Sequence, residues 1–343
     1  MDHDPSRVDH SSARTEAVPP DPPRSRLVRD GETIVARRQD GTGDVIERDG
    51  SPSIAPSLDA DCWFLSGPTA SGKTDLGVAL ARRLDAEIVS VDSMAIYRGL
   101  DVGTAKPGPS HRAAVRHHLI DMVSPQEPYS VARWLADAAR AADECRGRDR
   151  RILFVGGTPL YLKALRDGLA PLPGADARIR ASLEAEATRD GTPALHRRLA
   201  AVDPAAAARI HEGDLRRIVR ALEVAAVTGR PLSSHFAPAP QPWFDRRLMV
   251  VDLPRQVLRA RIDQRVERMF TGGLVEETER LLAAGGIGPT ALQGAGYAEV
   301  IALLAGEIDR AEAVRRTRMR TWHLAKRQLT WLRGFPHAVW LAA

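Results

Sequence analysis

Short apolar runs alternate with segments of helical periodicity along the chain from Cys62 onward. After the first run, for example, Leu76, Leu80 and Leu84 recur at the spacing of one helix face. Four runs have the length and apolar character of buried strands, and they lie at 62–65, 87–91, 151–155 and 248–253. This alternation predicts an α/β fold in which a parallel sheet is covered by helices on both faces.

The remaining periodic segments extend this pattern. Helical spacing also occurs at 129–142 and 160–165, and a long Arg-rich helix is expected from 311 to 332. A last short strand is expected at 338–341, close to the C-terminus. These segments place further helices and a final strand in the same α/β core.

Between the third and fourth expected strands, the chain from 174 to 229 is rich in Ala and Arg and contains no segment with the pattern of a strand. We expect several helices there and place this all-helical insertion at 174–229. The core is then formed by 61–173 and 230–343. Residues 1–60 are rich in Asp, Arg, Ser, Pro and Gly and keep no hydrophobic period, which is typical of a disordered tail.

Composition excludes several classes of protein. Hydrophobic residues make up 43% of the chain, which is enough for a core, but no run of about 18 apolar residues could span a membrane. The first residues lack the apolar stretch of a secretory signal, and Cys62 and Cys145 are too few for a disulfide framework. We therefore expect a reduced, monomeric protein of the cytoplasm.

Positive charge is in excess and comes almost entirely from arginine. The net charge of +5 is by itself a weak indication of a polyanionic partner. Only four of the 49 basic residues are lysines, and these are Lys73, Lys106, Lys163 and Lys326. Because an ammonium and a planar guanidinium are not interchangeable in a tight site, the rare lysines indicate candidate sites.

A phosphate-binding loop follows the first expected strand. Glycines in such a loop let successive N–H groups point at phosphate oxygens, and the next helix adds the positive end of its dipole. Lys73 would contact the outer phosphate, and the Thr74 hydroxyl would bind Mg²⁺. The residues that match the P-loop pattern are Gly67, Pro68, Thr69, Ala70, Ser71, Gly72, Lys73 and Thr74. Kinases, ATPases, GTPases and other transferases share this loop, so it does not identify the reaction.

Asp92 and Ser93 follow the second expected strand, at the edge where ligands bind in open α/β sheets. A carboxylate there would face the P-loop across a short gap. It could hold Mg²⁺ through water, accept a proton from a nucleophile, or simply cap the next helix. The spacing alone leaves these roles open.

Two adjacent histidines, His117 and His118, lie shortly before Asp121. They could bind a metal ion, but no further residue has the spacing of a ligand. A packed, hydrogen-bonded imidazole is the favoured interpretation.

These motifs and three others together resemble the tRNA dimethylallyltransferase (isopentenyl transferase) family. The resemblance runs from about residue 62 to the C-terminus, and all four lysines lie within its motifs. The matching segments, in the order of the family, are 67–74, 92–107, 117–121, 156–163, 220–229 and 325–331. Six separate motifs are far more specific than a P-loop alone.

The resemblance implies transfer of a dimethylallyl group from dimethylallyl diphosphate to tRNA. The acceptor would be the exocyclic amine of the adenosine 3′ of the anticodon, and diphosphate would be released. Asp92 would take the proton of the amine, while Lys73, Thr74 with Mg²⁺, and Arg261 would stabilise the diphosphate. The role of Arg261 rests on the resemblance alone.

The resemblance also implies that the helical insertion and the basic C-terminal helix bind the anticodon stem-loop. Phosphate contacts would supply affinity, and the target base would be flipped from its stack. Aromatic residues beside the cations of the C-terminal helix suit RNA. The candidate tRNA-binding residues are Asp92, Ser93, Met94, Ala95, Thr158, Arg180, Arg216, Arg217, Arg220, Gln293, Gly296, Tyr297, Lys326, Arg327, Gln328 and Arg333.

Two segments depart from the family pattern. Ala95 stands where the family has Gln, and Gly294, Ala295 and Ala298 stand where it has Ala, Ile and Lys. Both changes replace long polar side chains that the family would direct at the tRNA, and neither affects residues expected near the diphosphate. The alternatives are a transferase that prenylates free AMP or ADP, a P-loop kinase of a small metabolite, and an RNA-binding relative without activity.

Overall fold

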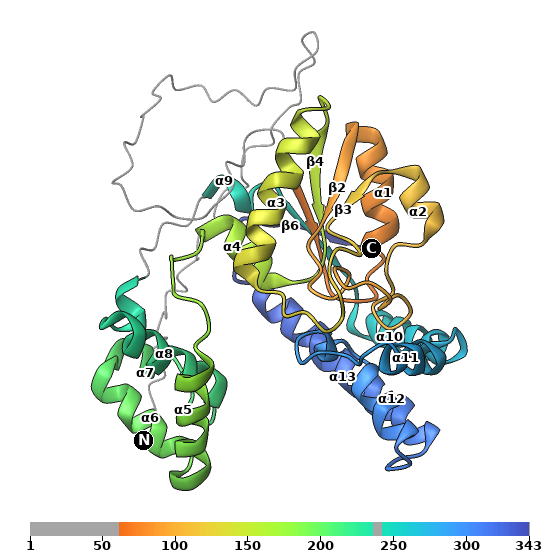
Figure 1. Ribbon diagram of the computed structural model, residues 1–343. Helices are drawn as coiled ribbons and strands as arrows, with labels where there is room; N and C mark the ends of the chain where they lie inside the picture. The colour runs from red at the N-terminus through yellow and green to blue at the C-terminus, as the bar shows by residue number, and fades with distance from the viewer. Residues whose placement is uncertain (1–61, 236–241, 343) are drawn as a thin grey trace, which may run out of the picture. The chain divides into compact units, whose positions relative to one another are not determined.

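The computed structural model describes residues 62–235 and 242–342. The tail expected at 1–60 lies outside the described residues. Within them a six-stranded sheet has the order β3-β2-β4-β1-β5-β6, and every neighbouring pair is parallel (Figure 1). Its strands are β1 (Cys62–Ser66), β2 (Ala86–Ser90), β3 (His117–His118), β4 (Arg151–Val155), β5 (Leu248–Asp252) and β6 (Val339–Ala342).

The expected strands agree with this sheet to within a residue or two. The exception is β3, which pairs with β2 over two residues only. Its polar sequence, His117-His118, carries no apolar run, so periodicity could not indicate a strand there.

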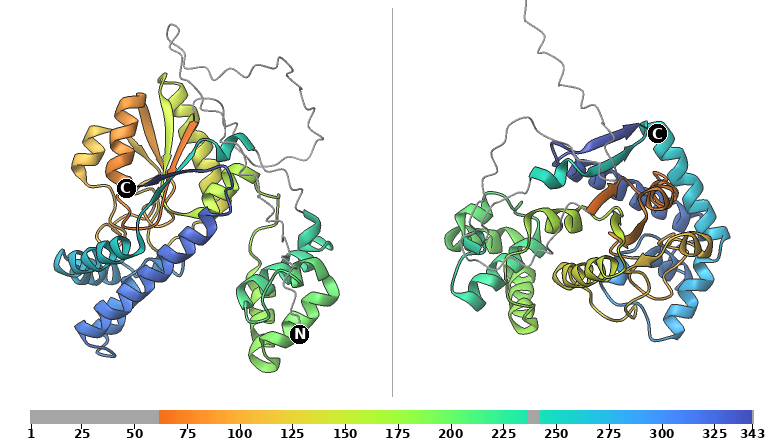
Figure 2. Two further views of the ribbon diagram at one scale, coloured as in Figure 1. Left: turned by 180° about the vertical axis from the view of Figure 1, so that it is seen from behind. Right: turned by 90° about the horizontal axis from the view of Figure 1, so that it is seen from above.

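Helices cover both faces of the sheet (Figures 1 and 2). The expected helices occur as α1, α3, α4 and α13, while the short α2 was not predicted. The helices of the core are α1 (Lys73–Leu84), α2 (Pro109–Ala114), α3 (Val131–Arg146), α4 (Pro159–Asp167), α9 (Pro242–Asp245), α10 (Arg255–Thr271), α11 (Leu274–Ala283), α12 (Tyr297–Leu304) and α13 (Arg310–Leu332). Of these described helices, none has the length and apolar character needed to cross a membrane.

Neighbouring residues of each central strand contribute to opposite faces, as the pleat requires. In β1, Leu65 belongs to the apolar cluster of α1, whereas Phe64 belongs to the cluster of α3 and α4. Leu153 and Phe154 of β4 divide in the same way. Both faces of these strands are therefore buried, and this explains why they are apolar runs without polar alternation.

The insertion at 174–229 is all-helical, as expected. It contains α5 (Ala177–Asp190), α6 (Thr192–Val202), α7 (Pro204–Ala207) and α8 (Leu215–Thr228). These helices bury an apolar cluster of their own, with Leu195 and Ile218 fully enclosed.

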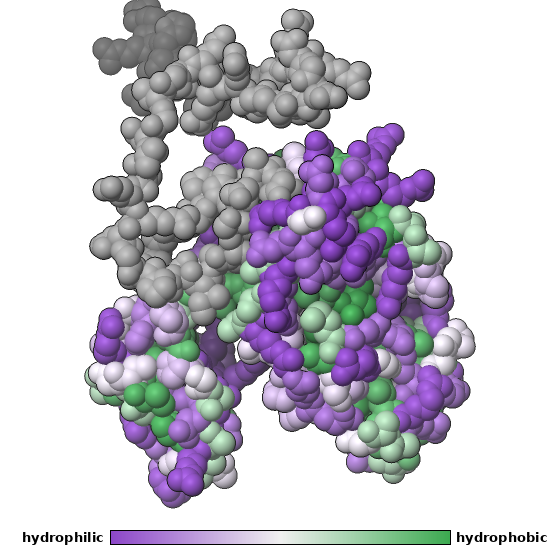
Figure 3. Space-filling model, turned by 45° about the horizontal axis from the view of Figure 1, so that its top comes forward, coloured by the Kyte–Doolittle hydropathy of each residue, from purple (hydrophilic) through white to green (hydrophobic). Residues whose placement is uncertain are grey.

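On the face drawn in Figure 3, hydrophilic residues cover most of the described surface and apolar residues show only in small groups.

Candidate active site

A pocket of about 660 Å³ lies at the carboxyl ends of the central strands. Parallel strands direct their carboxyl ends to one edge, where α/β proteins bind their ligands. The P-loop contributes Thr69, Lys73 and Thr74 to the pocket wall. The segments after β2 and β4 contribute the opposite side, with Asp92–Ala95 and Gly156–Pro159.

Lys73, Arg265 and the carboxylate of Asp92 all line this pocket. The Nζ atom of Lys73 donates to the Pro68 carbonyl at 3.3 Å, and Arg265 of α10 donates to the Thr104 carbonyl at 2.9 Å. Burial lowers the pKa of Lys73 to about 8, with the charge of Asp92 opposing the shift and that of Arg265 adding to it. A pocket with this excess of positive charge favours an anionic ligand.

Asp92 caps the turn after β2 and also lines the pocket. Its Oδ1 atom accepts hydrogen bonds from the backbone N–H groups of Met94 at 2.8 Å and Ala95 at 3.3 Å, and these bonds cap the turn after β2. The carboxylate nevertheless lines the pocket and acts electrostatically on Lys73 and Arg265. Capping therefore holds this carboxylate in the pocket wall.

The segment after β2 is hydrogen-bonded to the segment after β4 in the pocket wall. The hydroxyl oxygen of Thr158 accepts a hydrogen bond from the Ser93 N–H at 3.0 Å. Ala95, which is buried, lines the same wall. Gln293, Gly294 and Ala295 line the pocket from another segment. Of the positions that depart from the family pattern, Ala95, Gly294 and Ala295 therefore lie around one cavity.

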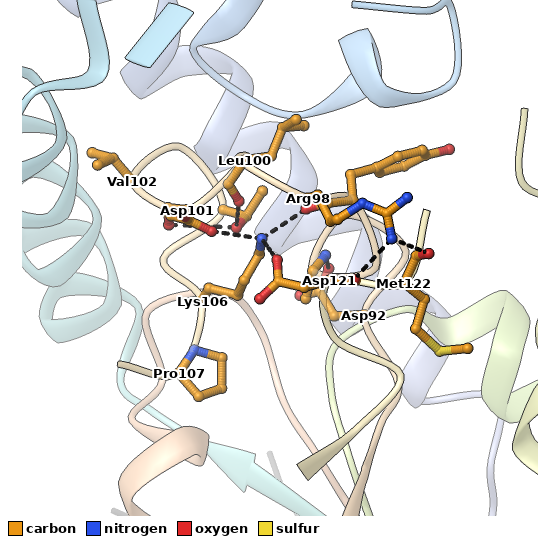
Figure 4. A network of polar contacts seen from close by, with 12 residues as sticks. Asp92, Arg98, Leu100, Asp101, Val102, Lys106, Pro107, Asp121 and Met122 are labelled. Carbon is orange, nitrogen blue, oxygen red and sulfur yellow. Dashed lines mark hydrogen bonds and ion pairs between the residues drawn. The ribbon is translucent and has the colours of Figure 1, made fainter. Parts of the chain in front are cut away.

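Lys106 forms hydrogen bonds within the loop that lines one side of the pocket (Figure 4). Its Nζ atom donates to the Tyr97 carbonyl at 2.7 Å and to the carboxylates of Asp101 and Asp121 at 2.6 Å each. Burial alone would raise the pKa of Asp121, but hydrogen bonds from Lys106 and Arg112 lower it overall. The side chain of this rare lysine is enclosed, and its interactions are internal.

Arg261 and Arg265 have different environments on one face of α10. Arg261 is exposed, and its Nη1 atom donates to the Ser71 carbonyl of the P-loop at 3.2 Å. Arg265, one turn later, lines the pocket itself. Sequence analysis missed Arg265, because an Arg-rich helix gives no signal for which arginine faces a ligand. The four-residue spacing from Arg261 was the available indication.

Two candidate tRNA contacts have other partners in the structure. Tyr297 is fully buried, and its hydroxyl donates to Glu277 at 2.7 Å. Its ring occupies the space where a side chain on Gly103 would begin, with the nearest ring atom 2.5 Å from that position. Gln328 is buried beside the P-loop. Both side chains thus have partners within the protein, and their contact with tRNA stays a prediction.

Gly296 immediately precedes α12, and its predicted contact with tRNA is not decided by this position. Its φ of 102° lies in the region that favours glycine, and its N–H donates to Glu299 at 3.0 Å at the start of α12. We accordingly assign it to the geometry of this helix start.

Basic side chains of α13 and of the insertion remain available to a polyanion. Lys326, Arg327 and Arg333 are exposed. Arg316, Arg320 and Arg327 line the pocket, although the first two were not singled out as site residues from the sequence.

In the insertion, Arg216 and Arg217 are exposed, whereas Arg180 and Arg220 form ion pairs with the buried Glu223. Arg180, Arg216 and Arg220 line a second hollow of about 460 Å³. The paired arginines therefore stabilise the insertion and still present N–H groups at its surface.

His118 is hydrogen-bonded, as the favoured interpretation required. Its Nε2 atom lies 2.6 Å from Glu87, which also accepts two hydrogen bonds from Arg148 at 2.9 and 2.7 Å. Cys145 lies 3.6 Å from the same carboxylate. The hydrogen bonds from Arg148 are the main cause that lowers the pKa of Glu87 to about 2.

Replacement of Glu87 by Gln is expected to destabilise the protein by about 2 kcal/mol at neutral pH, because Arg148 and His118 lose their charged partner. A lowered carboxyl pKa stabilises the fold above the ordinary value of 4.5, and this contribution disappears as pH falls towards about 2. Urea unfolding of both proteins should therefore show a difference that shrinks in acid. Glu144→Gln, in an exposed carboxylate nearby, is the control. A difference that does not change with pH would contradict this assignment.

The chain has extended similarity to known proteins. It matches the IPP transferase family over residues 95–335 and the isopentenyl transferase family over residues 60–124. It is 51% identical to a tRNA dimethylallyltransferase of Anaeromyxobacter dehalogenans, over 81% of this chain and 94% of that protein. It is 49% identical to that of Thioalkalivibrio sulfidiphilus, over 80% of this chain and 87% of that protein.

Solved structures agree in fold. The full-length tRNA isopentenylpyrophosphate transferase of Bacillus halodurans is 37% identical, with a TM-score of 0.59 over 82% of this chain and 89% of that chain. A eukaryotic dimethylallyltransferase acting on tRNA has a TM-score of 0.68 at 23% identity, over 81% of this chain and 73% of that chain. The chain thus shares its fold with both.

Proposed function

The chain belongs to the IPP transferase family, and from this membership we propose that it transfers a dimethylallyl group from dimethylallyl diphosphate to tRNA. The acceptor is the exocyclic amine of the adenosine 3′ of the anticodon, and diphosphate is released. One observation carries the proposal: the P-loop with Lys73, Arg265 of α10 and Asp92 line one pocket that is also lined by arginines of α13. Donor and acceptor chemistry can therefore meet in a single cavity.

The donor side stabilises the leaving group. As the bond between the allylic carbon and oxygen breaks, charge grows on the diphosphate, and Lys73 and Arg265 lie at the pocket to receive it. Arg261 supports the loop from outside through the Ser71 carbonyl. The hydroxyl of Thr74 and the carboxylate of Asp92 are hard oxygen donors that line the same pocket, which suits Mg²⁺. When bound by Thr74, that ion would neutralise diphosphate charge.

The acceptor side removes a proton. The adenine amine forms its new bond to the allylic carbon and must lose one proton as it does so. Asp92 is the carboxylate in the pocket wall that can accept it, and the turn bonds from Met94 and Ala95 fix its direction. Thr158 and Ser93 brace the same wall.

The tRNA is bound through its phosphates by arginines on α13 and on the insertion. We propose that Arg316, Arg320 and Gln293, which line the pocket near Ala95, supply the polar reach that the short side chain lacks. The protein would act as a monomer in the cytoplasm, where unmodified tRNA is present.

A competition assay tests the proposed function. The full chain is incubated with labelled dimethylallyl diphosphate, Mg²⁺, ATP, AMP and unmodified tRNA, and each acceptor is examined by mass spectrometry. Label on the adenosine beside the anticodon is expected. Label on AMP, consumption of ATP without prenyl transfer, or tRNA binding without transfer would each contradict the proposal.

A further inference from the structure

Gln328 connects the pocket-lining helix α13 to the P-loop. Its Oε1 atom accepts a hydrogen bond from the Thr69 N–H at 2.8 Å, and its Nε2 atom donates to the Gly157 carbonyl at 2.6 Å. Only 6% of the residue is exposed. The amide thus has its donor and acceptor directed at two different parts of the pocket wall.

One partner, the Thr69 N–H, lies on the side of the pocket proposed to bind the diphosphate, and the other, the Gly157 carbonyl, lies on the side proposed to bind the adenosine. Thr69 lies in the loop expected to hold the diphosphate, and its N–H is taken by Gln328 rather than left for a phosphate oxygen. Gly157 immediately precedes Thr158, whose hydroxyl fixes Ser93 next to Asp92. A single side chain therefore sets the relative position of the donor loop and the acceptor wall.

The surrounding structure leaves room for this amide and for little else. A side chain on Gly157 would begin 2.5 Å from the Nε2 atom of Gln328 and 3.2 Å from the Gly67 carbonyl. On the same helix, Ala325 and Leu329 pack in a cluster that includes Ala70 of the P-loop. The contact between α13 and the loop is thus both polar and apolar.

The helix that carries Gln328 also carries the cations that would meet RNA. Arg316, Arg320, Leu324 and Gln328 recur every four residues and line the pocket along one side of α13. Any shift of this helix when RNA binds would reach Thr69 and Gly157 through the amide. We propose that Gln328 is a positioning residue that aligns the P-loop with the Asp92 wall when tRNA occupies α13.

This inference rests on the proposed function but assigns Gln328 to the transfer step rather than to RNA binding. Loss of alignment between bound reactants by about 1 Å can cost on the order of a hundredfold in rate. The Gln328→Met variant keeps most of the side-chain volume and removes both hydrogen bonds. We expect roughly a hundredfold lower single-turnover rate, with an unchanged Kd for tRNA.

A second variant separates the two bonds and guards against loss of packing. Gln328→Glu keeps an oxygen for the Thr69 N–H but cannot donate to the Gly157 carbonyl, so it should also lose rate. Thermal unfolding of both variants establishes that the chain remains folded. A direct RNA contact would show the opposite pattern, which Lys326→Met should display: a weaker Kd for tRNA and a rate at saturating tRNA close to wild type.

The experiment measures single-turnover transfer and tRNA binding for wild type, the two Gln328 variants, Lys326→Met and the exposed control Thr330→Val. A lower rate with intact tRNA binding in the folded Gln328→Met protein supports the inference. Weaker tRNA binding with an intact rate, or no change in either quantity, overturns it. Absence of transfer by wild type would instead refute the proposed function, so the two failures are distinguishable.

Discussion

Replacement of Asp92 by Asn is expected to lower the rate of dimethylallyl transfer by roughly a thousandfold, which is within the range for loss of a general base. Asparagine keeps an Oδ1 atom for the Met94 and Ala95 N–H groups, so the turn after β2 should persist. What disappears is the basic carboxylate that accepts the proton of the adenine amine. Single-turnover kinetics at saturating tRNA measures this step without a contribution from binding.

The matched control is Asp101→Asn. Asp101 is also a carboxylate of the neighbouring loops, but its side chain is 59% exposed, pairs with Lys106 and does not line the pocket. This variant should retain most of its activity and a wild-type Kd for tRNA. If Asp92→Asn turned over like wild type, Asp92 could not be the base, and the acceptor side of the mechanism would need another carboxylate.

Replacement of Lys73 by Met is expected to lower kcat/KM for dimethylallyl diphosphate by roughly a hundred- to a thousandfold. The ammonium lies at the pocket beside Arg265 and Asp92, where it can meet charge as it develops on the leaving diphosphate. Burial lowers the pKa of Lys73 to about 8, so its charge is costly to bury, and a bound diphosphate would offset this cost. Initial rates at varied diphosphate concentration give the measurement.

Lys163→Met provides the comparison for this variant. Lys163 is a lysine of α4 that pairs with Asp167, and its side chain is 49% exposed. We expect its loss to leave kcat/KM for the diphosphate near the wild-type value. Equal effects of the two substitutions would mean that general charge, and not the position of Lys73 in the loop, determines catalysis.

The sequence indicated the parts of the fold that depend on local pattern. Buried parallel strands are continuous apolar runs, so β1, β2, β4 and β5 were visible in the chain. In contrast, β3 consists of two histidines and is defined by its pairing with β2. Pairing with a distant segment leaves no periodicity to detect.

The residues of the candidate site also fall into two groups, those that a local motif indicates and those whose surroundings depend on tertiary contacts. The P-loop and Asp92 were found because their chemistry is encoded in consecutive residues at a strand end. Arg265, Tyr297 and Gln328 differ from this. Whether such a residue faces a ligand, a carboxylate or a backbone amide depends on other segments of the chain, which lie 20 residues away for Tyr297 and Glu277 and 259 residues away for Gln328 and Thr69. Burial of these side chains is a tertiary property that motif order could not supply.

The most direct test of the account is a structure of the full chain with an unreactive dimethylallyl diphosphate analogue and an anticodon stem-loop. We expect the diphosphate on residues 67–74 beside Lys73, with the adenine amine within hydrogen-bond reach of Asp92, at about 3 Å. A diphosphate bound away from this loop, or an adenine amine held by another residue with Asp92 turned out of the pocket, would contradict it.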